Sequence, residues 1–107
     1  VLYVKQGQSK QFLILDAGMN DLIRPAMYHA KHKIINLSNP SGTNEVYDVV
    51  GPVCESSDVF VNDVVLPQCH RGHLIAICSA GAYCEAMASQ YNCRALAKSY
   101  LSEDFNI

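Results

Sequence analysis

The sequence has no long apolar run and no cluster of charge of one sign. A membrane helix needs about 18 consecutive apolar residues, which no run approaches, and the N-terminus lacks the charged, apolar and small-residue order of a signal peptide. We therefore expect a cytoplasmic protein. The net charge is −2, with lysine and arginine scattered along the chain. Neither nucleic acid nor a membrane surface is therefore an expected partner.

Several motifs that carry chemistry in other proteins are missing too. There is no glycine-rich phosphate loop, no Gly-x-Ser-x-Gly elbow and no His-Glu-x-x-His motif. Residues 69–73 (CHRGH) and Cys78 offer four potential zinc ligands, but they lack a paired Cys-x-x-Cys knuckle, and Cys78 ends an apolar run. We expect no metal site. The five cysteines, an odd number, favour free thiols over a disulfide framework.

What the sequence does contain is a series of short apolar runs rich in β-forming side chains. Half of its 107 residues are hydrophobic and 17% are charged, as is typical of one soluble globular domain. Turn-forming residues separate the runs, and Asn62-Asp63 is one such turn. Seven strands are predicted, at residues 1–4, 12–15, 34–37, 46–50, 59–61, 64–66 and 74–78. This spacing predicts a mainly all-β domain, a Greek-key-like barrel or sandwich.

Two stretches favour one or two short helical turns. Pro25 suits the first position of a helix, so a turn or two is expected over residues 26–32. Residues 83–91 are rich in alanine and methionine, which favour a short helix. Residues 95–101 remain ambiguous. The sequence shows no internal repeat and no low-complexity segment.

Cys54 and Glu55 follow Gly51-Pro52, where a strand is expected to end. Proline has no amide to donate to a strand ladder, and binding or catalytic sites are commonly built where a strand gives way to a loop. A thiol can donate a proton or act as a nucleophile, and a glutamate can hold an ammonium group. The alternative for Cys54 is a small core residue, because cysteine is among the most buried residue types.

Arg24, Tyr28 and Tyr83 are further candidates. Arg24 and Tyr28 lie on one side of a helical turn if Pro25 begins one, and together they could bind an anion. Tyr83 follows small residues that permit close approach of the backbone to a bulky group. The alternatives are a surface arginine over a tyrosine ring and a buried tyrosine bonded to a backbone carbonyl.

Four motifs, read in order, resemble the C-terminal signature of the diaminopimelate decarboxylases. They are residues 16–21 (DAGMND), 24–28 (RPAMY), 51–56 (GPVCES) and 81–83 (GAY), with 89–92 (SQYN) downstream. Each motif alone is weak, but the ordered set covers nearly the whole chain. The related ornithine decarboxylases typically have aspartate after the cysteine, so Glu55 favours the diaminopimelate branch.

The resemblance implies a fold-type III enzyme that depends on pyridoxal phosphate. In this family an α/β barrel carries the cofactor on a lysine, and a β domain closes the active site of a head-to-tail homodimer. Residues 1–107 resemble the β domain alone, and the sequence opens on Val1, so we expect a fragment without the N-terminal barrel. No lysine here lies in a motif like that of the cofactor lysine, and we expect no pyridoxal phosphate on this fragment.

The implied reaction removes CO2 from meso-diaminopimelate to give L-lysine, with the cofactor ring as electron sink. By the same resemblance, Arg24 and Tyr28 bind the carboxylate at the non-reacting end of the substrate, and Glu55 engages the distal amino group. Cys54 would be the proton donor after CO2 leaves. Cys54 and Glu55 enter the site of the neighbouring subunit, and Tyr83 lies beside the cofactor and its phosphate.

Two residues depart from the family pattern, and two alternative functions stay open. Ser57 and Cys84 stand where the family more often has glycine, so Cys84 would strain its turn if that position needs a positive φ. One alternative is a decarboxylase of ornithine, arginine or carboxynorspermidine. The other is a non-catalytic regulatory module, as antizyme inhibitors are by resembling ornithine decarboxylase. An intact upstream barrel with its lysine would exclude the second.

Overall fold

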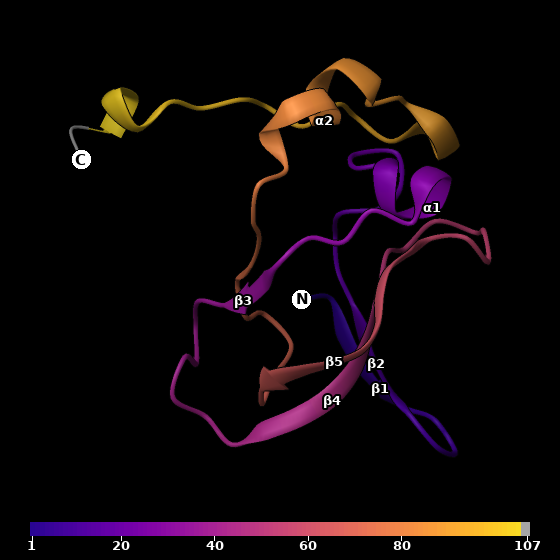
Figure 1. The fold of residues 1–107 in the computed structure, drawn as a ribbon, viewed down its shortest axis with the longest axis vertical. Coiled ribbons are helices and arrows are strands. Elements are labelled where there is room, and N and C mark those ends of the chain that lie inside the picture. The colour runs from indigo at the N-terminus through magenta and orange to yellow at the C-terminus, as the bar shows by residue number, and fades with distance from the viewer. Residues whose placement is uncertain (106–107) are drawn as a thin grey trace.

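The computed structural model describes residues 1–105 and consists mainly of β-strands (Figure 1). A four-stranded sheet has the order β1-β2-β4-β5, and a two-stranded sheet pairs β3 with β6. The strands are β1 Tyr3–Gln6, β2 Gln11–Ile14, β3 Ile34–Asn36, β4 Asn44–Val50, β5 Val59–Pro67 and β6 Ile75–Ile77. The expected mainly β class is confirmed.

The larger sheet mixes antiparallel and parallel pairs. The expected hairpin at the N-terminus is present as the antiparallel pair of β1 and β2, whereas β2 and β4 run parallel. β4 and β5 form a long antiparallel pair, as do the short strands β3 and β6. Within residues 1–105 the two sheets share no strand pairing, so the closed barrel that the strand pattern allowed is not found, and a Greek-key order is not confirmed.

The expected turn at Asn62-Asp63 is wrong, because β5 is continuous from Val59 to Pro67. Its pairing with β4 passes from Tyr47 opposite Val64 to Val49 opposite Val61, which leaves an extra residue on β5. Asp63 has a φ of 52°, and its amide donates to Asp48 Oδ1 at 2.9 Å. The turn-forming pair therefore makes a β-bulge within one strand, and two of the seven predicted strands become one.

The core lies where β2 and β4 run side by side. Leu13 and Val49 are paired across the two strands and are both 0% exposed. Tyr47 is buried as well, and its hydroxyl accepts the amide of Cys69 at 2.9 Å and donates to Glu45 at 3.1 Å. Burial raises the pKa of Tyr47 to about 12. The buried cluster comprises Leu13, Leu15, Leu22, Ile34, Tyr47, Val49, Phe60, Leu66 and Cys69.

The helices are short. α1 spans Arg24–Tyr28, with Pro25 in its first turn, and it ends where His29 adopts the left-handed conformation, so it is shorter than expected. α2 spans Gly81–Met87 but is interrupted at Ala82 and Tyr83, and the expected helix over residues 83–91 does not extend beyond it. Two 3-10 helices follow, η1 Tyr91–Cys93 and η2 Ser102–Phe105.

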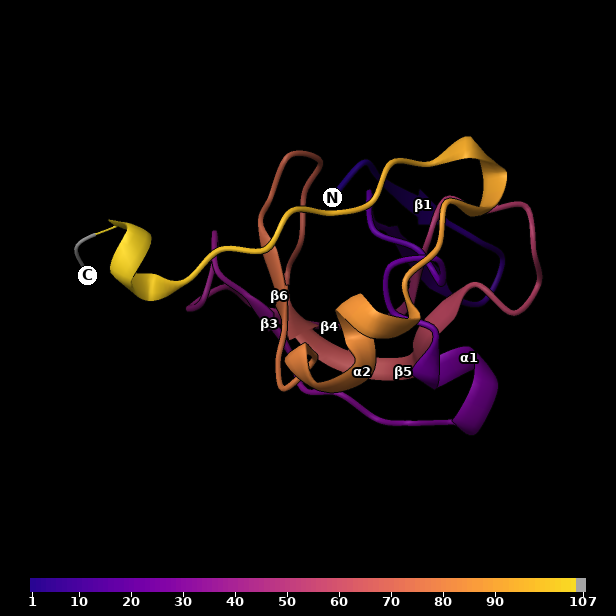
Figure 2. The same cartoon turned by 90° about the horizontal axis from the view of Figure 1, so that it is seen from above.

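In both views α2 lies close to α1, and the chain beyond η1 passes back across the molecule, beside α2, before it extends to η2 (Figure 2). Among residues 1–105 no helix has the length and apolar character needed to cross a membrane.

Candidate functional site

Arg24, Tyr28 and Tyr83 form a cluster where α1 meets the start of α2. The guanidinium carbon of Arg24 lies 5.0 Å from the ring centre of Tyr28 and 5.1 Å from that of Tyr83. The four-residue spacing thus brings Arg24 and Tyr28 together as expected, and the chain adds Tyr83 from a distant segment. The two tyrosines are 57% and 63% exposed, and none of the ion pairs within residues 1–105 involves Arg24.

This arrangement leaves a cation between two exposed phenols. A guanidinium with no carboxylate partner in the described part of the chain can bind one from a ligand through two parallel hydrogen bonds. The tyrosine rings favour the cation through their π faces. The cluster is therefore suited to an anionic group.

The backbone of Tyr83 adopts a conformation that is rare for a bulky residue. Ala82 has φ −66° and ψ 123°, and Tyr83 has φ 65° and ψ −8°. These are the central angles of a type II turn, whose second central position favours glycine. A side chain there costs roughly 1–2 kcal/mol. Strain of this kind is concentrated at functional sites, which agrees with a role for the Tyr83 side chain.

The strain expected at Cys84 therefore falls one residue earlier. Cys84 is not among the residues of positive φ in the described chain. Its thiol donates to the carbonyl of Asp21 at 3.0 Å and packs against the core. Burial raises the pKa of the Cys84 thiol, with Asp21 and Glu85 adding to the effect. Cys84 thus links α2 to the loop before α1 through this hydrogen bond.

The buried carboxylate of Asp58 anchors the loop that carries Cys54 and Glu55 through hydrogen bonds to backbone amides. Asp58 accepts the amides of Met19 and Val53, both at 2.7 Å. A Cβ on Gly51 would lie 2.4 Å from the Asp58 oxygens, so this close approach requires glycine. Cys54 and Glu55 are both exposed, and the alternative of Cys54 as a core residue is wrong.

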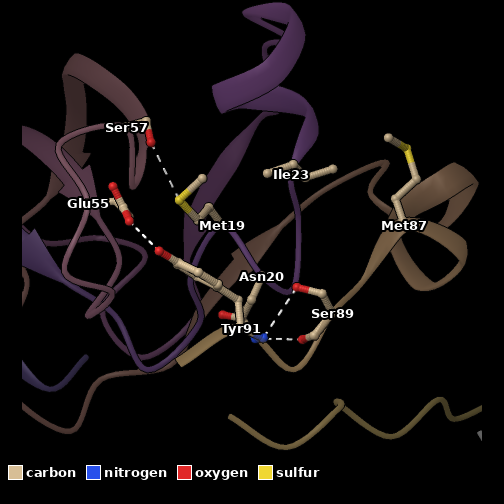
Figure 3. A pocket seen from close by; sticks show the side chains of 8 residues that line it. All are labelled: Met19, Asn20, Ile23, Glu55, Ser57, Met87, Ser89 and Tyr91. Atoms are coloured by element: carbon tan, nitrogen blue, oxygen red, sulfur yellow. Dashed lines mark hydrogen bonds between the residues drawn. The ribbon is translucent and has the colours of Figure 1, made fainter. Parts of the chain in front are cut away.

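Tyr91, the first residue of η1, contacts the side chain of Glu55. Its hydroxyl donates a hydrogen bond to Glu55 Oε1 (Figure 3). This bond, more than any other cause, raises the pKa of the Tyr91 phenol. Tyr91 lies in the motif at residues 89–92, and its place in the family signature is the signal in the sequence that points to it, although no role for Tyr91 is expected from the sequence.

A cavity of about 290 Å³ lies beside this hydrogen bond (Figure 3). Three apolar side chains and five polar ones line it: Met19, Asn20, Ile23, Glu55, Ser57, Met87, Ser89 and Tyr91. Of the expected site residues, Glu55 lines the cavity, and Cys54 directly precedes Glu55 in the chain. Arg24 follows the lining residue Ile23, but Arg24, Tyr28 and Tyr83 form their own cluster. The structure thus brings the expected residues together as two groups.

Within residues 1–105 no three His, Cys, Asp or Glu side chains are grouped as metal ligands would be. Two of the zinc candidates have other partners, since buried Cys69 donates to the carbonyl of Pro67 and His73 Nδ1 accepts the amide of His70.

For a phosphate-bearing cofactor, the exposed phenol of Tyr83 is one suitable donor. A Cβ on nearby Gly81 would meet no atom within 4 Å, so there is open space beside it. One phenol does not hold a dianion by itself. Tyr83 and the open space beside Gly81 are therefore suited to form one part of a cofactor site. Other parts of a protein would supply the remaining contacts.

Comparison with known proteins identifies the domain. The model of the family described as "Pyridoxal-dependent decarboxylase, C-terminal sheet domain" matches residues 1–81. The chain belongs to this family. The match includes Arg24, Tyr28, Cys54 and Glu55 and ends at Gly81, just before Tyr83.

The decarboxylase domain has relatives that extend over nearly the whole chain. It is 61% identical over 104 residues to a diaminopimelate decarboxylase of Bacteroides thetaiotaomicron, covering 97% of this chain and 27% of that protein. The solved diaminopimelate decarboxylase of Helicobacter pylori complexed with L-lysine is 53% identical, with a TM-score of 0.81 over 88% of this chain and 23% of that one. The M. jannaschii enzyme in co-complex with L-lysine is 43% identical, with a TM-score of 0.85 over 90% and 22%. This domain therefore spans about a quarter of the length of these relatives.

Proposed function

We propose that this chain is the C-terminal substrate-binding and dimerisation domain of a diaminopimelate decarboxylase. The whole enzyme would remove CO2 from meso-diaminopimelate to give L-lysine. The observation that carries the proposal is the Arg24 guanidinium, which contacts the rings of two exposed tyrosines and forms no ion pair within residues 1–105. The identity to relatives named diaminopimelate decarboxylase, two of them complexed with L-lysine, supports the choice of substrate.

In the proposed mechanism, this domain selects the substrate by the two charged groups at its non-reacting end. Arg24 and Tyr28 bind the carboxylate at the non-reacting end, and Glu55 accepts hydrogen bonds from the distal ammonium. Lysine or ornithine, bound as a substrate with its own carboxylate at the reacting end, has no second carboxylate and would leave the guanidinium unpaired once the site is closed. Such an omission costs on the order of 2–5 kcal/mol, which is enough to reject them.

Pyridoxal phosphate, bound to a lysine outside this chain, would supply an electron sink for the carbanion left by decarboxylation. Cys54 Sγ delivers a proton to the reacting carbon, and the hydroxyl of Tyr83 donates to the cofactor phosphate. Cys54 is exposed on a loop that Asp58 holds rigidly, as a donor must be to reach a substrate held elsewhere.

The proposed enzyme is a homodimer in which Cys54 and Glu55 enter the site of the partner subunit. The separation of the site residues into two groups supports this, because the loop that carries Cys54 and Glu55 can serve one active site while Arg24, Tyr28 and Tyr83 serve the other. A two-fold axis would then bring one group from each subunit to each site.

Arg24→Ala in the full-length enzyme tests the proposal. We expect kcat/KM for meso-diaminopimelate to fall on the order of 100-fold, because a buried carboxylate loses its charged partner. Pyridoxal phosphate binding, measured from its absorbance, should change less than about threefold, within the range of a surface substitution. Arg71→Ala is the control, since it removes an exposed arginine that belongs to neither group of site residues. Equal losses of substrate use and cofactor binding would refute the assignment.

A further inference from the structure

The carboxylate of Glu55 is exposed, and its side chain has rotatable bonds that a binding role would have to restrain. Asp58 fixes the backbone of this loop through the amides of Met19 and Val53, and the amide of Asp58 itself donates to the carbonyl of Glu55 at 3.1 Å. None of these contacts involves the Glu55 carboxylate. Tyr91, whose hydroxyl donates to Oε1, is the side chain that reaches it (Figure 3).

We propose that Tyr91 is a positioning residue, whose hydroxyl holds the Glu55 carboxylate in the orientation that receives the distal ammonium of the substrate. This deepens the proposed function and rests on it, since Glu55 is the ammonium acceptor there. An ionised carboxylate offers about four acceptor positions on two oxygens. Tyr91 occupies one position on Oε1, so Oε2 and the remaining positions stay available to an ammonium group.

The position of Tyr91 is set by contacts that do not involve Glu55. Buried Asn20 accepts the amide of Ser89 at its backbone oxygen, 2.9 Å away, and donates from its side chain to the carbonyl of Ser89 at 3.3 Å. Arg94 Nε donates to Asn20 Oδ1 at 3.0 Å. Tyr91 thus lies between Ser89 and Arg94, which both form hydrogen bonds with Asn20. Its hydroxyl is therefore held beside Glu55 in the absence of a substrate.

The chemistry of the pair suits a cationic ligand. A phenol adds no charge, so it restrains the carboxylate without neutralising it, whereas a lysine or arginine in the same place would compete with the substrate ammonium. The hydrogen bond to Glu55 raises the pKa of the Tyr91 phenol, which keeps the donor protonated. The apolar side chains of Met19 and Met87 on the neighbouring cavity wall offer the carboxylate no competing partner.

The test is a double-mutant cycle in the full-length enzyme. Tyr91→Phe keeps the ring and removes the hydroxyl, and we expect KM for meso-diaminopimelate to rise about tenfold with kcat within about twofold, because a group that acts on substrate binding changes KM. In a Glu55→Gln background the same change should alter KM less than about twofold. Tyr100→Phe is the matched control, since Tyr100 is exposed and its ring packs against Phe105.

The outcomes separate this inference from the proposed function. If Glu55→Gln leaves KM for meso-diaminopimelate unchanged, the role of Glu55 fails, and the inference fails with it. If Glu55→Gln raises KM while Tyr91→Phe has no effect, or if the two effects add fully, the inference alone is overturned.

A measurement independent of activity uses tyrosine labelled with ¹³C at Cζ in the full-length enzyme, with the Tyr91 signal assigned from its loss in Tyr91→Phe. The Tyr91 phenol should titrate at lower pH in Glu55→Gln than in the wild type. An unchanged titration would also overturn the inference.

Discussion

At the scale of single residues, the backbone of Tyr83 is the clearest sign that function constrains this domain. A tyrosine occupies the turn position that favours glycine, and its ring contacts Arg24. A glycine at position 83 would relieve the backbone strain but would remove the ring that contacts Arg24. The strain is therefore retained for what the side chain does.

Substitution of Tyr83 by glycine and by alanine should reveal this strain. Both changes remove the ring, so their difference reports on the backbone alone. We expect Tyr83→Gly to be about 1 kcal/mol more stable than Tyr83→Ala, because only alanine has a Cβ that opposes positive φ. Urea denaturation followed by circular dichroism measures the two free energies of unfolding.

Tyr28 provides the control for this comparison, because it lies in α1 with ordinary helical geometry. There the order should reverse, with glycine about 0.5–1 kcal/mol less stable than alanine. If alanine is the more stable variant at position 83 as well, Tyr83 is not strained.

Some site residues are predictable from the local sequence, and others are not. The spacing of Arg24 and Tyr28 was informative because a proline starts their helix, so one turn determines their relation. The strain was assigned to Cys84 because a family glycine suggested that position, whereas the φ values depend on the whole turn. Tyr91 meets Glu55 across 36 residues of sequence, and no local pattern encodes that contact.

At the scale of elements, the segment from Ser89 to Arg94 is held to the loop before α1 by a small network. Arg94 donates to Asn20 Oδ1 and to the carbonyl of Asp16, and lies 3.9 Å from Asp21 Oδ2. Asn20 is buried, so its polar atoms need these partners. The network links two stretches that the family signature places far apart in sequence.

Arg94→Ala should loosen this segment without unfolding the domain. We expect the amide of Ser89, which donates to Asn20, to exchange its hydrogen about tenfold faster, because the loss of charged hydrogen bonds favours local opening. Hydrogen exchange followed by NMR measures the rate at that residue. Lys98→Ala removes an exposed charge further along the tail and should leave the rate unchanged. Equal acceleration in both variants, or none in Arg94→Ala, would contradict the network.

Most strands were predictable because their apolar runs are flanked by strong turn signals. The first hairpin and the strand before Gly51 are examples. The error at Asn62-Asp63 arose because these residues favour a turn by themselves, while Asp48 on the paired strand accepts the Asp63 amide and turns the signal into a bulge. The parallel pairing of β2 with β4 joins strands distant in sequence, and periodicity alone does not contain it.

At the scale of the whole molecule, burial of weakly acidic groups makes stability depend on alkaline pH. Burial raises the pKa of Tyr47 to about 12 and also raises the pKa of the Cys69 and Cys84 thiols. The unfolded chain would ionise these groups near their ordinary values of 9.0 for cysteine and 10.0 for tyrosine. Between about pH 9 and pH 12 the folded chain therefore holds more protons than the unfolded chain, and its free energy of unfolding falls as pH rises.

This linkage can be measured as the urea midpoint between pH 8 and pH 12 under reducing conditions. The stability from these groups should be complete below about pH 9 and decline as the pH passes through the raised values, with Tyr47 accounting for on the order of 2–3 kcal/mol. Tyr47→Phe should be less stable at neutral pH, since the amide of Cys69 loses its acceptor, but its decline between pH 10 and pH 12 should be shallower. A midpoint that stays level or rises from pH 9 to pH 11 would mean that these groups ionise as easily in the folded core as in water.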